Sequence, residues 1–210
     1  GGDQRTRVRQ EIVLGVGGTK ALAALHIHPG VYHLNEGHSV FATLEAIRER
    51  MHNDGLSFDN ALRDVAQHTV FTTHTPEEAG NEKHDIFLCH KMSYFCGLSI
   101  DEVKALAEFE EDQFNHSLVA LRFAGIANGV SRLHGEVSRH MWSKYTNICP
   151  ITSITNAQNW NYWADKKLYE SMATNDVVQY NDRKMYLKKR AMEIVADQTG
   201  KLFKTDVFTI

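Results

Sequence analysis

The chain has 210 residues, of which 42% are hydrophobic and 23% are charged, a composition typical of a globular protein. Its 23 lysines and arginines against 26 aspartates and glutamates leave a net charge of −3, and no block of basic residues marks a nucleic-acid surface. No apolar run approaches the roughly 18 residues that a membrane-spanning helix requires. Neither a nucleic-acid partner nor a membrane partner is therefore expected.

The first part of the chain predicts a helix followed by a strand. Residues 5–25 have a helical pattern, although Gly15, Gly17 and Gly18 loosen or break its middle. Residues 31–35 form a short apolar run after Pro29 and Gly30, which predicts a buried strand.

The same succession of helix and strand is then repeated. Val40, Leu44, Ile47 and Met51 fall on one face of a helix that Gly55 ends. Ser57 is placed to cap a helix over residues 58–67, and residues 69–73 predict a second strand. Helices that alternate with strands indicate a parallel α/β sheet.

Two polar loops, residues 36–38 and 74–81, follow the two predicted strands. In open α/β sheets, ligands bind beyond the carboxyl ends of the strands. We therefore expect both loops to lie on the ligand-binding edge of the sheet.

The remainder of the chain is predicted to be mostly helical. Residues 99–102 read as a capping box that opens a helix to about Phe109. The segment from Gly125 to Gly129 is expected to break a helix. Two apolar stripes at helical spacing predict buried helix faces. The first consists of Val130, Leu133, Val137 and Met141. The second consists of Leu187, Ala191 and Ile194, and Gly200 is expected to end that helix. Residues 206–210 predict a strand.

The first polar loop combines His33, Asn35, Glu36 and His38, which could hydrogen-bond several sugar hydroxyls at once. The alternative is an ordinary cap between a strand and a helix. Histidine and glutamate also bind metals, but the helical spacing of a metal site is absent and Gly37 indicates a loop. No metal site is predicted.

Three further clusters have a functional and a structural interpretation. Residues 72–75 place threonines and His74 at a strand end, where polar side chains either face a cleft or form a turn. Residues 128–139 could begin a helix that receives an anion, or could pack two helices tightly through glycines. Residues 154–163 combine aromatic and amide side chains, as a carbohydrate site or a core plug would.

Four segments give the pattern its specificity through their order and spacing. Residues 32–41 (YHLNEGHSVF), 70–81 (VFTTHTPEEAGN), 128–139 (NGVSRLHGEVSR) and 154–163 (ITNAQNWNYW) resemble the α-glucan (glycogen/maltodextrin) phosphorylase family, most closely its shorter bacterial and archaeal branch. The resemblance implies transfer of the terminal α-1,4-glucosyl unit of glycogen or maltodextrin to inorganic phosphate, giving glucose 1-phosphate. It also implies pyridoxal phosphate bound to a lysine. The three cysteines, Cys89, Cys96 and Cys149, are an odd number at no metal-binding spacing, which indicates reduced thiols and a cytoplasmic location. A homo-oligomer is possible.

The fold that the resemblance implies is a two-domain GT-B glycosyltransferase, of which this chain would be an internal fragment. The fragment is expected to be a helix-rich α/β part of the first Rossmann-like half. Residues 1–160 would complete the first domain, residues 161–205 would form a helical connection, and residues 206–210 would begin the first strand of the second domain. The cofactor lysine would lie outside this chain, so the fragment alone is expected to be inactive.

The resemblance also assigns roles to five residues. His74 matches the catalytic-pocket histidine that contacts the glucosyl unit, and Glu36, His38 and Asn156 match substrate-binding residues. Trp163 matches a tryptophan packed near the cofactor. Residues 157 and 159 depart from the family pattern, since they are alanine and asparagine where the family has glycine and a histidine or threonine.

Two other functions compete with this interpretation. The polar loops would also suit a non-catalytic α-glucan-binding module, and histidine with glutamate would suit a metal hydrolase. The ordered segments favour the phosphorylase interpretation over both.

Overall fold

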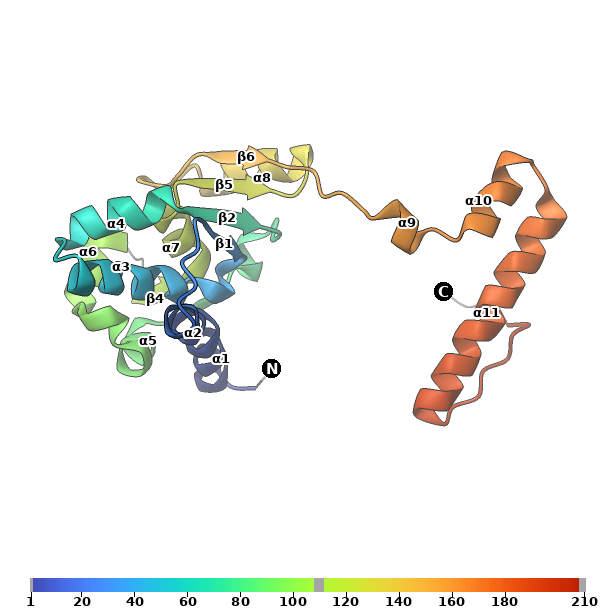
Figure 1. Ribbon diagram of the computed structural model, residues 1–210, viewed down its shortest axis with the longest axis horizontal. Coiled ribbons are helices and arrows are strands. Elements are labelled where there is room, and N and C mark those ends of the chain that lie inside the picture. Colours follow the sequence, from blue (N-terminus) through green and yellow to red (C-terminus); the bar gives the residue numbers. More distant parts are fainter. Residues whose placement is uncertain (1, 108–111, 208–210) are drawn as a thin grey trace. The chain divides into compact units, whose positions relative to one another are not determined.

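The computed structural model describes residues 2–107 and 112–207, without the side chains of a few residues between 93 and 107. The chain divides into two compact units, Gly1–Asn156 and Ala157–Ile210, which we call the first and the second unit (Figure 1). None of the described helices is both long and apolar enough to cross a membrane.

The first unit is built on a four-stranded parallel sheet with the order β1-β2-β5-β6 (Figure 1). The strands are β1 (Tyr32–Asn35), β2 (Thr69–Thr73), β5 (Ile126–Gly129) and β6 (Ile151–Ser153). Leu34, Phe71, Ala127 and Ile151 pair in register across the four strands, and all four are buried. This apolar row anchors the sheet in the core. Because all pairs are parallel, the four carboxyl ends lie on one edge.

A second, antiparallel sheet pairs β3 (Lys83–Asp85) with β4 (Gln113–Asn115). The helices of the first unit are α1 (Gln4–Ile12), α2 (Gly18–Ala24), α3 (Phe41–Asn53), α4 (Phe58–Gln67), α5 (Ile86–Ser93), α6 (Ile100–Ala107), α7 (His116–Phe123) and α8 (Arg132–Trp142). The short helical turns are η1 (Val13–Gly17), η2 (Gly37–Ser39), η3 (Glu78–Gly80) and η4 (Tyr94–Gly97).

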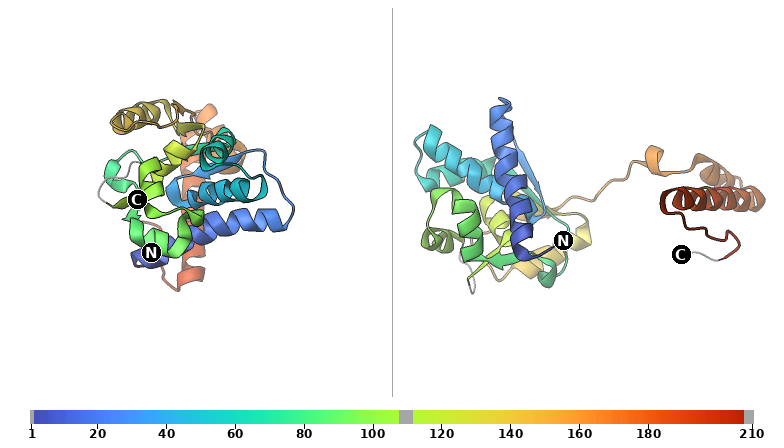
Figure 2. Two further views of the ribbon diagram at one scale, coloured as in Figure 1. Left: turned by 90° about the vertical axis from the view of Figure 1, so that its left-hand side faces the viewer. Right: turned by 90° about the horizontal axis from the view of Figure 1, so that it is seen from below.

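The glycine-rich middle of the first predicted helix forms the π-helix η1. The elements α1, η1 and α2 run as one continuous helix, seen in blue in the right-hand view of Figure 2. A Cβ atom on Gly15 would lie 2.6 Å from the backbone nitrogen of Ala42. Glycine at this position therefore lets the helix lie against the start of α3.

The two predicted helix–strand repeats are confirmed. Helix α4 has the predicted bounds, and the Ser57 hydroxyl accepts from the backbone N–H of Asn60 at 3.4 Å. At the N-cap and in the first half of the preceding helix, α3, the residues Val40, Leu44 and Ile47 are buried, as their spacing predicts. The burial of β1 was predicted wrongly: it is an edge strand, and only Leu34 within it is buried.

The described residues from 112 onward are mostly helical, as predicted, but they also include the strands β4, β5 and β6, which were not predicted. Strand β5 lies where glycines were expected to break a helix. The predicted apolar face of α8 was wrong, since Leu133 is 71% exposed. The buried face carries His134, Gly135, Ser138 and Trp142.

Small residues explain why the face of α8 with His134, Gly135 and Ser138 is the one that packs on the sheet. A Cβ atom on Gly135 would lie 2.7 Å from the Cβ of Ser153, and one on Gly129 would lie 2.8 Å from the Gly135 nitrogen. Backbone-to-backbone packing on β5 and β6 therefore decides which side of α8 faces the sheet, and the apolar stripe does not.

Helix α6 begins after Ser99, as predicted. The Glu102 side chain of the expected capping box and the expected helix end near Phe109 lie outside the described residues.

The second unit contains α9 (Trp160–Trp163), α10 (Lys166–Ala173) and α11 (Val177–Thr199). Gly200 ends α11 with φ +70°, as predicted. The predicted stripe of Leu187, Ala191 and Ile194 does not form a buried face, because no residue of α11 is buried. Of the predicted last strand, Asp206 lies in a turn, and residues 208–210 lie outside the described residues.

Candidate functional site

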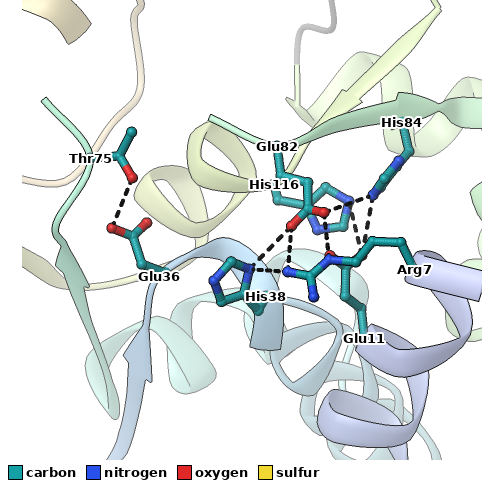
Figure 3. A network of polar contacts seen from close by, with 8 residues as sticks. All are labelled: Arg7, Glu11, Glu36, His38, Thr75, Glu82, His84 and His116. Carbon is teal, nitrogen blue, oxygen red and sulfur yellow. Dashed lines mark hydrogen bonds and ion pairs between the residues drawn. The ribbon is translucent and has the colours of Figure 1, made fainter. Parts of the chain in front are cut away.

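Glu36 links the two polar loops at the carboxyl edge of the sheet. Its backbone N–H donates to the Thr72 carbonyl at 2.9 Å. Its carboxylate accepts from the backbone N–H of His74. It also accepts from the Thr75 hydroxyl at 3.2 Å (Figure 3). The structure thus brings the predicted residues Glu36 and His74 together, with the Glu36 side chain fixing the His74 backbone.

The backbone of Glu36 is strained, with φ 64° and ψ 173°. This region is almost restricted to glycine, and a residue with a side chain held there costs about 1–3 kcal/mol. Such strain concentrates at functional sites, where the surrounding structure maintains it. The bonds to His74 and Thr75 are contacts that offset the cost here.

Gly37 lets the same loop lie on the start of α7. A Cβ atom on Gly37 would be 2.8 Å from the Cβ of His116. Any larger residue would push the loop, with Glu36 and His38, away from α7.

His38 belongs to a charged group on the other side of this loop (Figure 3). Its Nδ1 lies 2.8 Å from Arg7 Nη2 and 3.1 Å from Glu82 Oε2. Arg7 also donates to both oxygens of Glu82, at 2.6 and 3.0 Å. Burial alone would raise the pKa of Glu82, but the adjacent His84 imidazole and the hydrogen bonds from Arg7 hold that pKa well below its usual range.

Three buried side chains, Glu11, His84 and His116, lie next to this group (Figure 3). The carboxylates of Glu11 and Glu82 raise the pKa of His84 to about 9. Burial lowers the pKa of His116 to about 3, and the charge on His84 acts in the same direction. Burial also raises the pKa of Glu11. Contact with His84 acts in the opposite direction and partly offsets this rise.

A cavity of about 1010 Å³ opens between the Glu36 loop and the loop that precedes β3. Its lining includes Glu36, His38, Arg7, Glu82 and Ser117. His74 is not among the lining residues described, although its backbone is bonded to Glu36. The cavity therefore offers carboxylate, imidazole, guanidinium and hydroxyl groups to a polar ligand.

Asn156 follows β6 and so leaves the same edge of the sheet as Glu36 and His74. Its side chain is exposed, and its backbone N–H donates to the Val130 carbonyl at 3.0 Å. Trp163 belongs to the second unit, where it is 73% exposed and meets the Tyr162 ring edge-on. The roles of these residues, and those of Glu36, His38 and His74, stay predictions.

The contacts of residues 128–139 are structural. Asn128 accepts from the Thr72 hydroxyl at 2.8 Å within the sheet. Ser131 caps α8, and His134 Nδ1 accepts from the Val130 N–H at 3.1 Å. The anion-binding interpretation of this helix start gains no support from these contacts.

Sequence reasoning did not identify Arg7, Glu11, Glu82, His84 and His116. They come from the N-terminal helix, from the segment around β3 and from α7, so no single motif contains them. Two signals were available: Arg7 and Glu11 stand four apart on one helix face, and Glu82 and His84 stand two apart, on the same side of an extended segment.

Comparison with known proteins identifies relatives over most of the chain. An uncharacterized protein of Methanocaldococcus jannaschii is 39% identical over 203 residues, covering 97% of this chain and 36% of that protein. A glycogen phosphorylase of Mycobacterium tuberculosis is 40% identical over 185 residues, and a maltodextrin phosphorylase of Thermococcus litoralis is 40% identical over 169 residues. These two matches cover 78% and 77% of this chain.

The chain spans only 21% and 20% of those two phosphorylases. No protein-family model matches it. The resemblance that the four segments predicted is confirmed: the chain is related by sequence to glycogen and maltodextrin phosphorylases over most of its length.

Proposed function

We propose, from its relationship to glycogen and maltodextrin phosphorylases, that this chain is part of an α-glucan phosphorylase and forms one wall of its glucosyl pocket. The observation that carries the proposal is the strained Glu36, whose carboxylate holds the His74 loop at the carboxyl edge of the sheet. The four parallel strands are compatible with the first Rossmann-like half of a GT-B fold, which is part of the proposal.

In this proposal the chain binds and orients the sugar. The His74 imidazole contacts the terminal glucosyl unit, and the Asn156 amide bonds a hydroxyl from the other end of the sheet edge. A neutral hydrogen bond to a hydroxyl contributes about 0.5–1.5 kcal/mol, and several together fix the ring for attack by phosphate. Glu36 positions His74 through its backbone N–H.

Pyridoxal phosphate is proposed for the complete enzyme, where it would supply proton transfer through its phosphate. The described residues do not build a site for it. Trp163 is largely exposed, and the nearby cavity is lined by Trp160, Tyr169 and residues other than Trp163. No step of the reaction is therefore assigned to this chain's residues through the cofactor.

The test uses the protein encoded by the complete gene that contains this sequence. We expect it to release glucose 1-phosphate from maltodextrin only when inorganic phosphate is present. No release from folded protein loaded with pyridoxal phosphate contradicts the proposal. We expect the 210 residues alone to release none, because they span about a fifth of the named phosphorylases.

Variants of the complete protein test the roles within the site. His74→Ala should lower kcat/KM roughly two- to thirteenfold, the equivalent of about 0.5–1.5 kcal/mol. Glu36→Ala should also lower it, whereas Glu36→Gln keeps an oxygen that accepts from the His74 N–H and should lower it less. His52→Ala, an exposed change on α3, serves as the control. Equal activity of His74→Ala and the control argues against the assigned pocket.

A further inference from the structure

Glu11, His84 and His116 point three ligand atoms at one buried place. Glu11 Oε2 lies 3.5 Å from His116 Nε2 and 3.6 Å from His84 Nε2. These separations are longer than the 2.7–3.2 Å of ordinary hydrogen bonds. The three atoms lie within 4.8 Å of one another.

The two separations between the carboxylate oxygen and the imidazole nitrogens fit a shared metal ion better than direct hydrogen bonds. Zinc binds histidine nitrogen at about 2.0–2.1 Å and carboxylate oxygen at about 2.0–2.2 Å, so adjacent ligands of a tetrahedral site stand roughly 3.3–3.5 Å apart. We propose that Glu11 Oε2, His84 Nε2 and His116 Nε2 bind a divalent transition-metal ion, with zinc the best match to two histidines and one carboxylate.

The three side chains are buried, and their polar atoms make no hydrogen bonds to the described residues. Glu11 is 1% exposed, His84 is 4% exposed and His116 is fully buried. No side-chain nitrogen or oxygen of the three makes a hydrogen bond to any residue that the structure describes. Buried polar groups without partners are costly, and a shared metal ion satisfies one atom of each.

Glu82 and Arg7 border the cluster. Glu82 Oε1 lies 3.4 Å from His84 Nε2, so Glu82 or a water molecule would take the fourth position. Arg7 Nε lies 3.3 Å from Glu11 Oε1 and 2.6 Å from Glu82 Oε1. Two carboxylates against one guanidinium leave one negative charge, which favours a cation here. A divalent ion would reverse that charge to one positive charge, whereas a proton on His84 would cancel it, and this proton is the competing explanation.

The burial of the ligands indicates a structural role. The ion would join α1, β3 and the first residue of α7, directly beneath the Gly37 loop. This differs from a metal hydrolase, whose ion must reach substrate. The inference is independent of the proposed function.

The test is metal binding by the 210-residue chain, purified, stripped by chelator and reconstituted with zinc. We expect about one zinc per chain and loss of it in His84→Phe, which keeps an aromatic ring. The control is the double variant His26→Ala/His28→Ala, which removes two exposed histidines and should keep the zinc.

Substoichiometric zinc in folded protein overturns the proposal and leaves the proton on His84 as the explanation. So does full zinc binding by His84→Phe. If His84→Phe does not fold, two further measurements still test whether a metal ion binds at this cluster. Cobalt in the unaltered chain should give the intense visible absorption of a tetrahedral site, and Glu11→Gln, which keeps the size of the side chain, should abolish it. A spectrum without that absorption, or one unchanged by Glu11→Gln, also overturns the proposal.

Discussion

The two units differ in what holds them together. The first unit has a continuous apolar core that includes Phe41, Phe71, Phe114 and Trp142, all nearly or fully buried. In the described residues of the second unit, Ser171 is the only buried residue. Its large apolar side chains are at least partly exposed, among them Trp160, Tyr162, Trp163, Met172, Met185 and Phe203.

The second unit relies on helix ends and local polar contacts. Asp165 and Asp176 cap α10 and α11, and Gly200 closes α11. Arg183 donates to both oxygens of Asp165, the shortest contact being 2.6 Å, and so joins the two helices. Regular helices in this chain therefore form without a buried apolar core around them.

The largest effect should come from emptying the core of the first unit. Phe71→Ala removes a fully buried ring from the central strand β2 and should lower the free energy of unfolding by about 3–5 kcal/mol. Met185→Ala on α11 starts from a side chain that is 51% exposed and should change it by less than about 0.5 kcal/mol. Urea denaturation of both variants measures this difference. Similar losses would remove the contrast between the units.

A smaller effect should separate two glycines of the first helix. Gly15→Ala places a Cβ against the backbone of Ala42 and should cost about 1–3 kcal/mol. Gly18→Ala meets nothing within 4 Å and has helical dihedrals, so it should stabilise by about 0.5–1 kcal/mol. Thermal unfolding of the pair gives the sign of each change. Stabilisation by Gly15→Ala would show that the contact with α3 is not tight.

The smallest effect on the whole molecule should come from Asp165→Ala. This change removes the cap of α10 and the partner of Arg183. We expect faster hydrogen exchange at the amides of residues 166–173 and no change in β1 and β2. Asp182→Ala, an exposed change on α11, is the control. Faster exchange throughout the first unit would show that the two units are coupled in stability.

The sequence predicted the elements whose signals are local. Ser57 and the apolar spacing that follows it define α4 to the residue, and Gly200 defines the end of α11. The strands β5 and β6 were missed because they have four and three residues, and their sheet membership comes from pairing with β2 and with each other. Such long-range pairing leaves little trace in a local pattern.

The candidate site was predicted in part for the same reason. The contact of Glu36 with the His74 loop follows from two strand ends on one edge, which the repeated helix–strand pattern predicts. The group around His84 and His116 comes from three segments that are distant in the sequence. Only the packing of these segments in the folded core brings its side chains together. The strain at Glu36 also has no sequence signal, because a glutamate rarely adopts a positive φ.

The π-helix η1 has a consequence for insertions and deletions in this part of the chain. A π turn accommodates one more residue than an α turn, and each residue of an α-helix turns the face by about 100°. Losing a single residue from Val13–Gly17 would let the segment close as a regular α-helix. Because the π turn absorbs its extra residue, Arg7 and Glu11 would keep their phase relative to α2 and stay beside Glu82 and His84. A gap of one position within Val13–Gly17 is therefore compatible with the same buried charges in a relative, whereas a gap of one position in a regular α-helical stretch would rotate them away.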